Sequence, residues 1–226
     1  MFKNLLGFWK GKDFLAQVFD DFNQMLEDSE FMFSSVSEHL LVSPRPAGLK
    51  DKIRDVDQKI NVQQREIRRR IVEHLTLQPT VEFTACLVLM SVVKDAERLG
   101  DYCKNLYEVI ELHQGPIDKA LYTDFFDGLD QDIKTLFEQT KAAFIDADED
   151  KARHAWDVER RVAKSCDDIV KRLATSDLSV NQAVCFTLIA RHYKRIVAHL
   201  VNIATAVILP LSDLDYFDEQ RSSDES

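Results

Sequence analysis

Two stretches of this chain follow one pattern, ERLGDYCKN at residues 97–105 and KRIVAHLVN at residues 194–202. Both keep an arginine at the second position, a branched apolar residue after it and an asparagine at the end. The second stretch has lost both acids of the first, Glu97 and Asp101. The pair predicts a duplicated helical unit with an acidic face, suited to metal binding, in the first copy and a neutralised face in the second.

The composition favours a few long helices. The 226 residues include only 6 Gly and 5 Pro, so few turns are available, and 45% hydrophobic residues suffice for a substantial core. The chain is therefore expected to be all-α. The formal net charge of −10 argues against non-specific nucleic-acid binding as its main task, because phosphate backbones repel an acidic protein.

The sequence predicts a cytoplasmic protein. The four cysteines form no CxxC pair and are typical of small apolar residues in a reduced protein; they are Cys86, Cys103, Cys166 and Cys185. Residues 1–10 lack the long apolar region of a signal peptide, and no stretch approaches the roughly 20 apolar residues of a membrane-spanning helix.

The same opening segment mixes large apolar residues with lysines: Phe2, Lys3, Leu5, Leu6, Phe8, Trp9, Lys10 and Lys12. Two interpretations are open. The segment lies against a membrane or a partner, as amphipathic segments do, or it caps the core of its own bundle.

Six helical stretches follow from the three- and four-residue spacing of apolar residues. They cover residues 13–42, 49–77, 81–112, 117–146, 149–174 and 180–209. Thr80 is the expected N-cap of the third, and a Gly-Pro break at residues 115–116 divides the chain near its middle. We expect two tandem antiparallel three-helix bundles, a first repeat over 13–114 and a second over 116–211, with a polar tail at 212–226.

Four oxygen-bearing residues, here called the acidic face, are expected to converge in the first repeat: Asp57, Asn61, Glu97 and Asp101. Each helix contributes a pair four residues apart, which lies on one side of that helix. Asp57 precedes Pro79 by 22 residues and Asp101 follows it by 22, so an antiparallel hairpin brings both to similar heights. Such an oxygen cluster suits Mg²⁺, Mn²⁺, Ca²⁺ or iron better than copper.

A plainer interpretation of the acidic face stays open. Acids four residues apart are common on exposed helices, where they form a solvated polar stripe. Arg98 or Lys94 would then screen the carboxylates, and no metal would be needed.

The second repeat offers no equivalent ligand set. The corresponding positions are Glu159, Ala163, Lys194 and Ala198. His192 and His199, two turns apart, form a possible unrelated ligand pair, although a histidine on a long amphipathic helix more often has a structural role.

The motif ERxGDxxxN at Glu97–Asn105, with Asp57-x-x-x-Asn61 on the preceding helix and a weaker copy at residues 195–202, resembles the PhoU family. The resemblance covers about residues 14–211 and implies an all-helical protein of two tandem three-helix bundles. It places the family's metal-binding motif on Glu97 and Asp101, with Asp57 as the companion acid and Asn61 beside it. The implied cofactor is a divalent or ferric ion (iron, Mg, Mn or Zn), in at most one full cluster. Residues 82–84 depart from the family's usual Asp-Leu-Arg.

The resemblance also implies a function. PhoU-like proteins are cytoplasmic, often dimeric, negative regulators of phosphate uptake and signalling that contact a phosphate transporter and its sensor histidine kinase at the membrane. A related group comprises accessory proteins of low-affinity phosphate permeases.

Two other classes remain as alternatives. A di-iron protein would also build its site from bundle carboxylates, but the characteristic Glu-x-x-His pair is absent from the sequence. A plain helical scaffold would use its acids only for solubility. The sequence has no Gly-rich phosphate loop and no GxSxG, so we expect a protein that is not an enzyme.

Overall fold

The computed structural model describes residues 13–44, 46–78 and 83–214. Over these ranges the chain forms seven α-helices and one short 3-10 helix, with no strand. They are α2 (Asp13–His39), α3 (Leu49–Leu77), α4 (Phe83–Leu112), α5 (Lys119–Phe126), α6 (Leu129–Asp146), α7 (Glu149–Ala174), α8 (Val180–Thr205) and η1 (Leu211–Asp213). The expected all-α class is confirmed.

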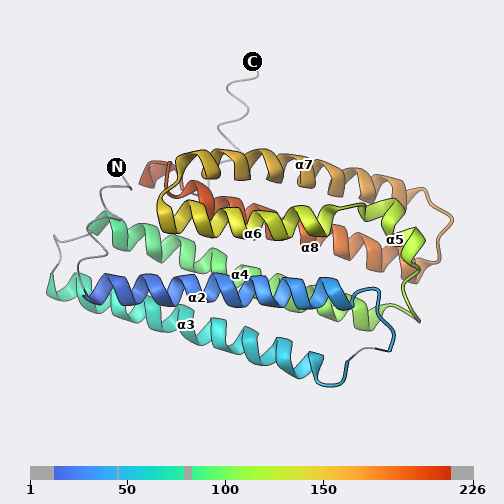
Figure 1. The fold of residues 1–226 in the computed structure, drawn as a ribbon, viewed down its shortest axis with the longest axis horizontal. Helices are drawn as coiled ribbons and strands as arrows, with labels where there is room; N and C mark the ends of the chain where they lie inside the picture. The colour runs from blue at the N-terminus through green and yellow to red at the C-terminus, as the bar shows by residue number, and fades with distance from the viewer. Residues whose placement is uncertain (1–12, 45, 79–82, 215–226) are drawn as a thin grey trace, which may run out of the picture.

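Two three-helix bundles lie side by side (Figure 1). Helices α2, α3 and α4 form the first, and α6, α7 and α8 form the second, which the short α5 precedes. The bundles meet where α4 packs on α8 and α2 packs on α6. The expected pair of tandem bundles is confirmed, and one hydrophobic core runs through both.

The helices of the second bundle begin at local sequence signals. Asp148 accepts hydrogen bonds from the backbone N–H groups of Asp150 and Lys151, each at 3.1 Å. Ser179 and Gln182 form a capping box at the start of α8. These side chains satisfy donors that every helix start leaves unpaired. The predicted starts at residues 149 and 180 therefore agree with the structure.

One predicted helix is wrong. The stretch 117–146 is divided into α5 and α6, because Gly128 adopts a φ of 72° and turns the chain. Two predicted ends are also too late, since α2 ends at His39 and α8 at Thr205. The proposed N-cap Thr80 and residues 215–226 of the predicted tail lie outside the described residues.

Helices α3 and α4 approach closely at Gly100. A Cβ at this position would lie 3.0 Å from Cδ1 of Ile60 on α3, which is tighter than ordinary van der Waals contact. Gly100 therefore allows α3 and α4 to approach more closely than a larger residue at this position would permit. The corresponding position in the second repeat is Val197, which is buried.

A polar cluster joins the two bundles between α4 and α8. His199 Nδ1 donates to Asp95 Oδ1 at 2.7 Å, and Asn202 Nδ2 donates to the same oxygen at 3.1 Å. Tyr102 stacks on His199 and also contacts His192, with ring centroids 5.6 and 5.9 Å apart. The two sequence repeats are offset by 97 residues, so Asp95 corresponds to His192 and Tyr102 to His199. The cluster thus sits on the axis that relates the repeats.

The four cysteines are buried and free, as expected of small apolar residues in helices. Within the described ranges, no helix combines the length and the apolar character that crossing a membrane requires.

Gly100→Val is expected to destabilise the fold by about 1–3 kcal/mol, because the added methyl groups must push Ile60 or the α3 backbone aside. Gly100→Ala should be close to neutral, since it gains about 1 kcal/mol of helix propensity against a smaller clash. Urea unfolding followed by circular dichroism measures both. A valine variant as stable as the wild type would contradict the close approach.

Asp95→Ala is expected to cost about 1–3 kcal/mol of unfolding free energy, because it leaves two partly buried donors, His199 and Asn202, without their acceptor. Adding His199→Ala should then cost much less than it does alone, in a double-mutant cycle. Asp168→Ala, which removes an exposed pair with Lys171, is the control and should leave the unfolding midpoint unchanged. Strict additivity of the Asp95 and His199 changes would contradict the proposed coupling.

Candidate functional site

The acidic face lies where α3 packs on α4. Asp57 on α3 is 7% exposed, and Glu97 and Asp101 come from α4. Lys104 lies on α4, one turn beyond Asp101, and its side chain extends toward α3. Its Nζ donates to Asp57 Oδ2 at 2.9 Å and to Asp101 Oδ1 at 3.0 Å. The structure thus brings Asp57 and Asp101 together on one cationic atom of the chain itself.

Arg98 neutralises the outer side of the same cluster. Its Nη1 donates to Asp101 Oδ2 at 3.1 Å, and its Nε lies 3.6 Å from Glu97 Oε2. The Glu97 side chain is 15% exposed, and burial followed by repulsion from Asp101 raises its pKa. Arg98 therefore screens the acids as the plainer interpretation expects. Lys94 is exposed and forms no ion pair with these acids in the described part of the chain.

Lys104 remains charged in this setting. Burial alone would lower its pKa, but the hydrogen bonds to Asp57 and Asp101 outweigh that effect, and its pKa is raised above the ordinary value. The lysine is therefore an ammonium ion at neutral pH, held by two carboxylates from two helices.

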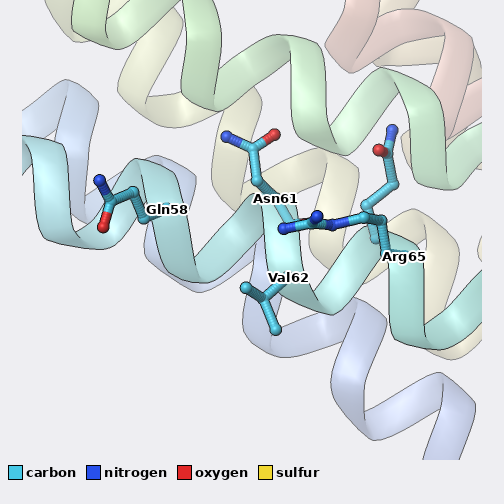
Figure 2. A pocket seen from close by; sticks show the side chains of 5 residues that line it. Gln58, Asn61, Val62 and Arg65 are labelled. Atoms are coloured by element: carbon cyan, nitrogen blue, oxygen red, sulfur yellow. The ribbon is translucent and has the colours of Figure 1, made fainter.

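Asn61, the fourth predicted ligand, lines a hollow on α3 together with Gln58, Val62, Gln64 and Arg65 (Figure 2). The hollow measures about 450 Å³. The backbone carbonyl of Asn61 accepts a hydrogen bond from Arg65 Nε at 3.2 Å. Within the described ranges, no hydrogen bond joins the Asn61 carboxamide to the carboxylates of the acidic face. Asn61 thus shares α3 with Asp57, while Glu97 and Asp101 lie on α4.

The donor set of the acidic face suits a hard cation, because carboxylate oxygens are the ligands that Mg²⁺, Mn²⁺ and iron prefer. The arrangement does not yet suit one, because the Lys104 ammonium lies where Asp57 and Asp101 converge. Among the residues described, no group of three or more His, Cys, Asp or Glu side chains is placed to hold a metal ion. Metal binding at Asp57, Asn61, Glu97 and Asp101 stays a prediction, and it requires Lys104 to move.

The second repeat has a basic residue on the equivalent face. Lys194, which takes the place of Glu97, pairs with Asp167 on α7 at 2.6 Å. Glu159, the counterpart of Asp57, is 8% exposed and lines a hollow of about 380 Å³ with Lys194. His199 Nδ1 binds Asp95, and both His192 and His199 lie against the Tyr102 ring, so their role as a ligand pair stays a prediction.

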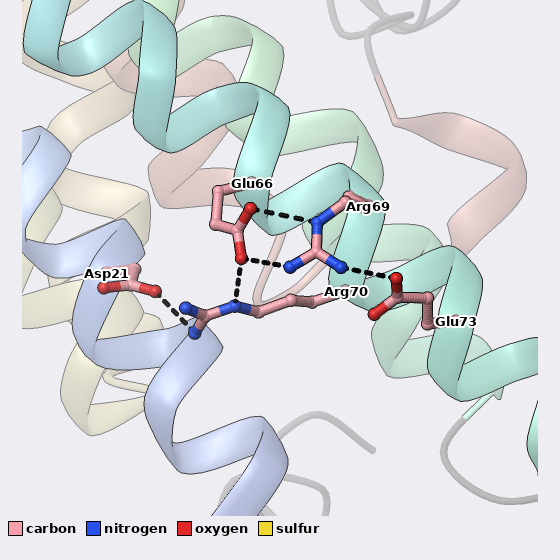
Figure 3. A network of polar contacts seen from close by, with 5 residues as sticks. All are labelled: Asp21, Glu66, Arg69, Arg70 and Glu73. Atoms are coloured by element: carbon pink, nitrogen blue, oxygen red, sulfur yellow. Dashed lines mark hydrogen bonds and ion pairs between the residues drawn. The ribbon is translucent and has the colours of Figure 1, made fainter.

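The outer side of α3 carries a separate network of ion pairs (Figure 3). Arg69 binds Glu66 at 2.6 Å and also Glu73, and Arg70 links Glu66 to Asp21 of α2 at 3.0 Å. Hydrogen bonds from Arg69, and next from Arg70, lower the pKa of Glu66 to about 2. These charges are largely solvated, so the network fixes the surface of α3 more than it stabilises the fold.

Sequence reasoning missed Lys104 and Asp95. A local signal existed for Lys104, because it lies three residues after Asp101 and so on the same face of α4. No local signal pointed to Asp95, whose partners on α8 are more than 100 residues away.

Comparisons with known proteins agree with this fold. The PhoU domain family model matches residues 22–110 and 129–207, one segment in each repeat. The phosphate-specific transport system accessory protein PhoU homolog of Synechocystis sp. is 25% identical over 162 residues, which cover 69% of this chain and 71% of that protein.

Two solved structures are also similar. The phosphate transport system regulatory protein PhoU from Streptococcus pneumoniae superposes with a TM-score of 0.71 at 15% identity, over 85% of this chain and 92% of that one. PhoU from Pseudomonas aeruginosa gives a TM-score of 0.73 at 20% identity, over 86% and 95% of the two chains. At these identities the structures support the fold, and the family model, which covers most of both repeats, decides the assignment. The chain therefore belongs to the PhoU family.

Proposed function

We propose that this protein regulates inorganic phosphate transport and phosphate-responsive signalling as a non-enzymatic, cytoplasmic accessory protein. The observation that carries the proposal is the PhoU family match in both repeats, on a fold of two tandem bundles. The similar Synechocystis protein is named as an accessory protein of a phosphate-specific transport system. The proposed mode of action is contact with a phosphate transporter subunit, a sensor histidine kinase or both, with peripheral association at the membrane.

We place this contact on the outer face of α3. Over the described residues, the main contacts of α3 are with α2 and α4, and its other side is available to a partner. That side combines Val62, which is 56% exposed, with the exposed Arg65 and the hollow around Asn61. Exposed apolar and arginine side chains around a concave surface are typical of residues that anchor protein–protein contacts.

The metal ion predicted at Asp57, Asn61, Glu97 and Asp101 is not required by this proposal. A partner that binds the outer face of α3 meets side chains whose positions are set by the packing of α3 on α2 and α4.

Tagged protein purified from cells grown at high phosphate is expected to capture a phosphate transporter subunit or a sensor histidine kinase. Val62→Asp should lower the yield of that partner by about 10-fold or more, because it places a charge in the proposed contact. Val180→Asp, at an 81% exposed position on α8, is the matched control and should capture as the wild type does.

Capture of a single-subunit phosphate permease instead would favour the second candidate, an accessory protein of a low-affinity permease. Failure to capture any phosphate transport or signalling protein, at high and at low phosphate, would contradict the proposed function.

We also propose that the protein forms a homodimer. Size-exclusion chromatography with light scattering is expected to give twice the 26.1 kDa mass of one chain. A monomer at all concentrations would contradict this part of the proposal and leave the contact on α3 to be judged by the capture experiment.

A further inference from the structure

The acidic face contains its own cations. Three carboxylates gather there, and Lys104 and Arg98 supply two positive charges from the same helix as Glu97 and Asp101. Because Lys104 follows Asp101 by three residues, the helix itself directs the ammonium toward the carboxylates. Only Asp57 comes from another helix. Lys104 therefore ties α3 to α4 in the way that a shared metal ion would.

A metal ion and this ammonium need the same oxygens. Asp57 Oδ2 and Asp101 Oδ1 lie 2.9 and 3.0 Å from Lys104 Nζ. A Mg²⁺, Mn²⁺ or iron ion would have to approach those oxygens to about 2.1 Å. The two cations would then be near neighbours in a partly buried place, where like charges repel strongly. Occupation by one excludes the other.

We propose that Lys104 is the resident cation of this acidic face, so that a divalent or ferric ion binds at Asp57, Glu97 and Asp101 only when the ammonium is removed. The inference concerns the cation alone and does not depend on the proposed role in phosphate transport.

The second repeat provides independent support. Its equivalent face also contains a lysine paired with an aspartate of the neighbouring helix, Lys194 with Asp167. The two lysines are similarly exposed, 31% for the Lys104 side chain and 33% for Lys194, but they come from different positions of the repeat. Each repeat thus neutralises the contact between its last two helices with a lysine ammonium.

The test compares Lys104→Met with wild type by calorimetric titration with Mn²⁺, and by metal analysis after incubation with Fe³⁺ and desalting. Wild type is expected to bind Mn²⁺ with a Kd of about 1 mM or weaker, and the variant at least about 100-fold more tightly, because the competing charge is gone. Mn²⁺ at about 100 times its Kd should raise the unfolding midpoint of the variant by about 5–10 °C. EDTA should leave the unfolding midpoint of the wild type unchanged.

Lys194→Met is the matched control. It removes a lysine of similar exposure from its ion pair with Asp167. Of the acidic set only Glu159 remains on this face, with Ala163 and Ala198 at the other positions, so the variant should gain no metal binding. Adding Glu97→Gln and Asp101→Asn to Lys104→Met should abolish the binding that the single change creates.

Two results would overturn the proposal. The first is stoichiometric Mn²⁺ or Fe³⁺ in the wild type with an affinity that Lys104→Met does not improve. The second is a folded Lys104→Met variant that takes up neither ion. If that variant does not fold, a measurement on the wild-type protein still tests the proposal. Mn²⁺ should leave the amide resonances of Asp57 and Asp101 unbroadened, and selective broadening there would refute the resident ammonium.

Discussion

The structure depends on the position of α4, which packs on α2, α3 and α8 at once. Fifteen of its 30 residues are buried, so half of its side chains must fit closely against neighbouring helices. Polar side chains on such a helix need partners, because an unpaired buried charge costs several kcal/mol. Two groups of polar side chains on α4 join it to its neighbours. Asp95 faces α8, and Glu97, Asp101 and Lys104 face α3. Each group fixes one neighbouring helix.

The two groups have different roles in the duplicated fold: the first joins the two repeats, and the second joins two helices of one repeat. Asp95, Tyr102, His192 and His199 lie on the axis between the repeats, where each residue must match the other repeat as well as its own. The described ion pairs of the acidic face join only α3 and α4, so this face can differ between the repeats without changing the contact between the bundles. This explains why one face carries Glu97 and Asp101 while the other carries Lys194 and Ala198, although the fold of both halves is preserved.

Local patterns were sufficient for much of the fold. The bounds of α3 and α7 agree with the sequence prediction, because the apolar spacing is regular in both and Asp148 caps the start of α7. The break between α5 and α6 was missed, since the apolar spacing continues through Gly128 and only the left-handed backbone of that glycine shows the turn. The hairpin arithmetic brought Asp57 and Asp101 together correctly. It gave no information on Lys104, because a search for metal ligands considers the acids and passes over the base on the same face.

The contact between α3 and α4 requires positive charge beside Asp57, and the chemical identity of that charge is secondary. A metal ion would supply it with several strong bonds but would make the contact depend on metal supply. A lysine supplies it from within the chain, at a cost of up to about 2 kcal/mol in side-chain entropy. The ammonium also binds through flexible donors that tolerate small shifts of the helices, whereas a metal ion imposes fixed distances. A regulator of the proposed kind, which fits a partner along α3, would gain from the first property and would have no need of the second. A lysine in the place of a metal ion is therefore compatible with the fold around it.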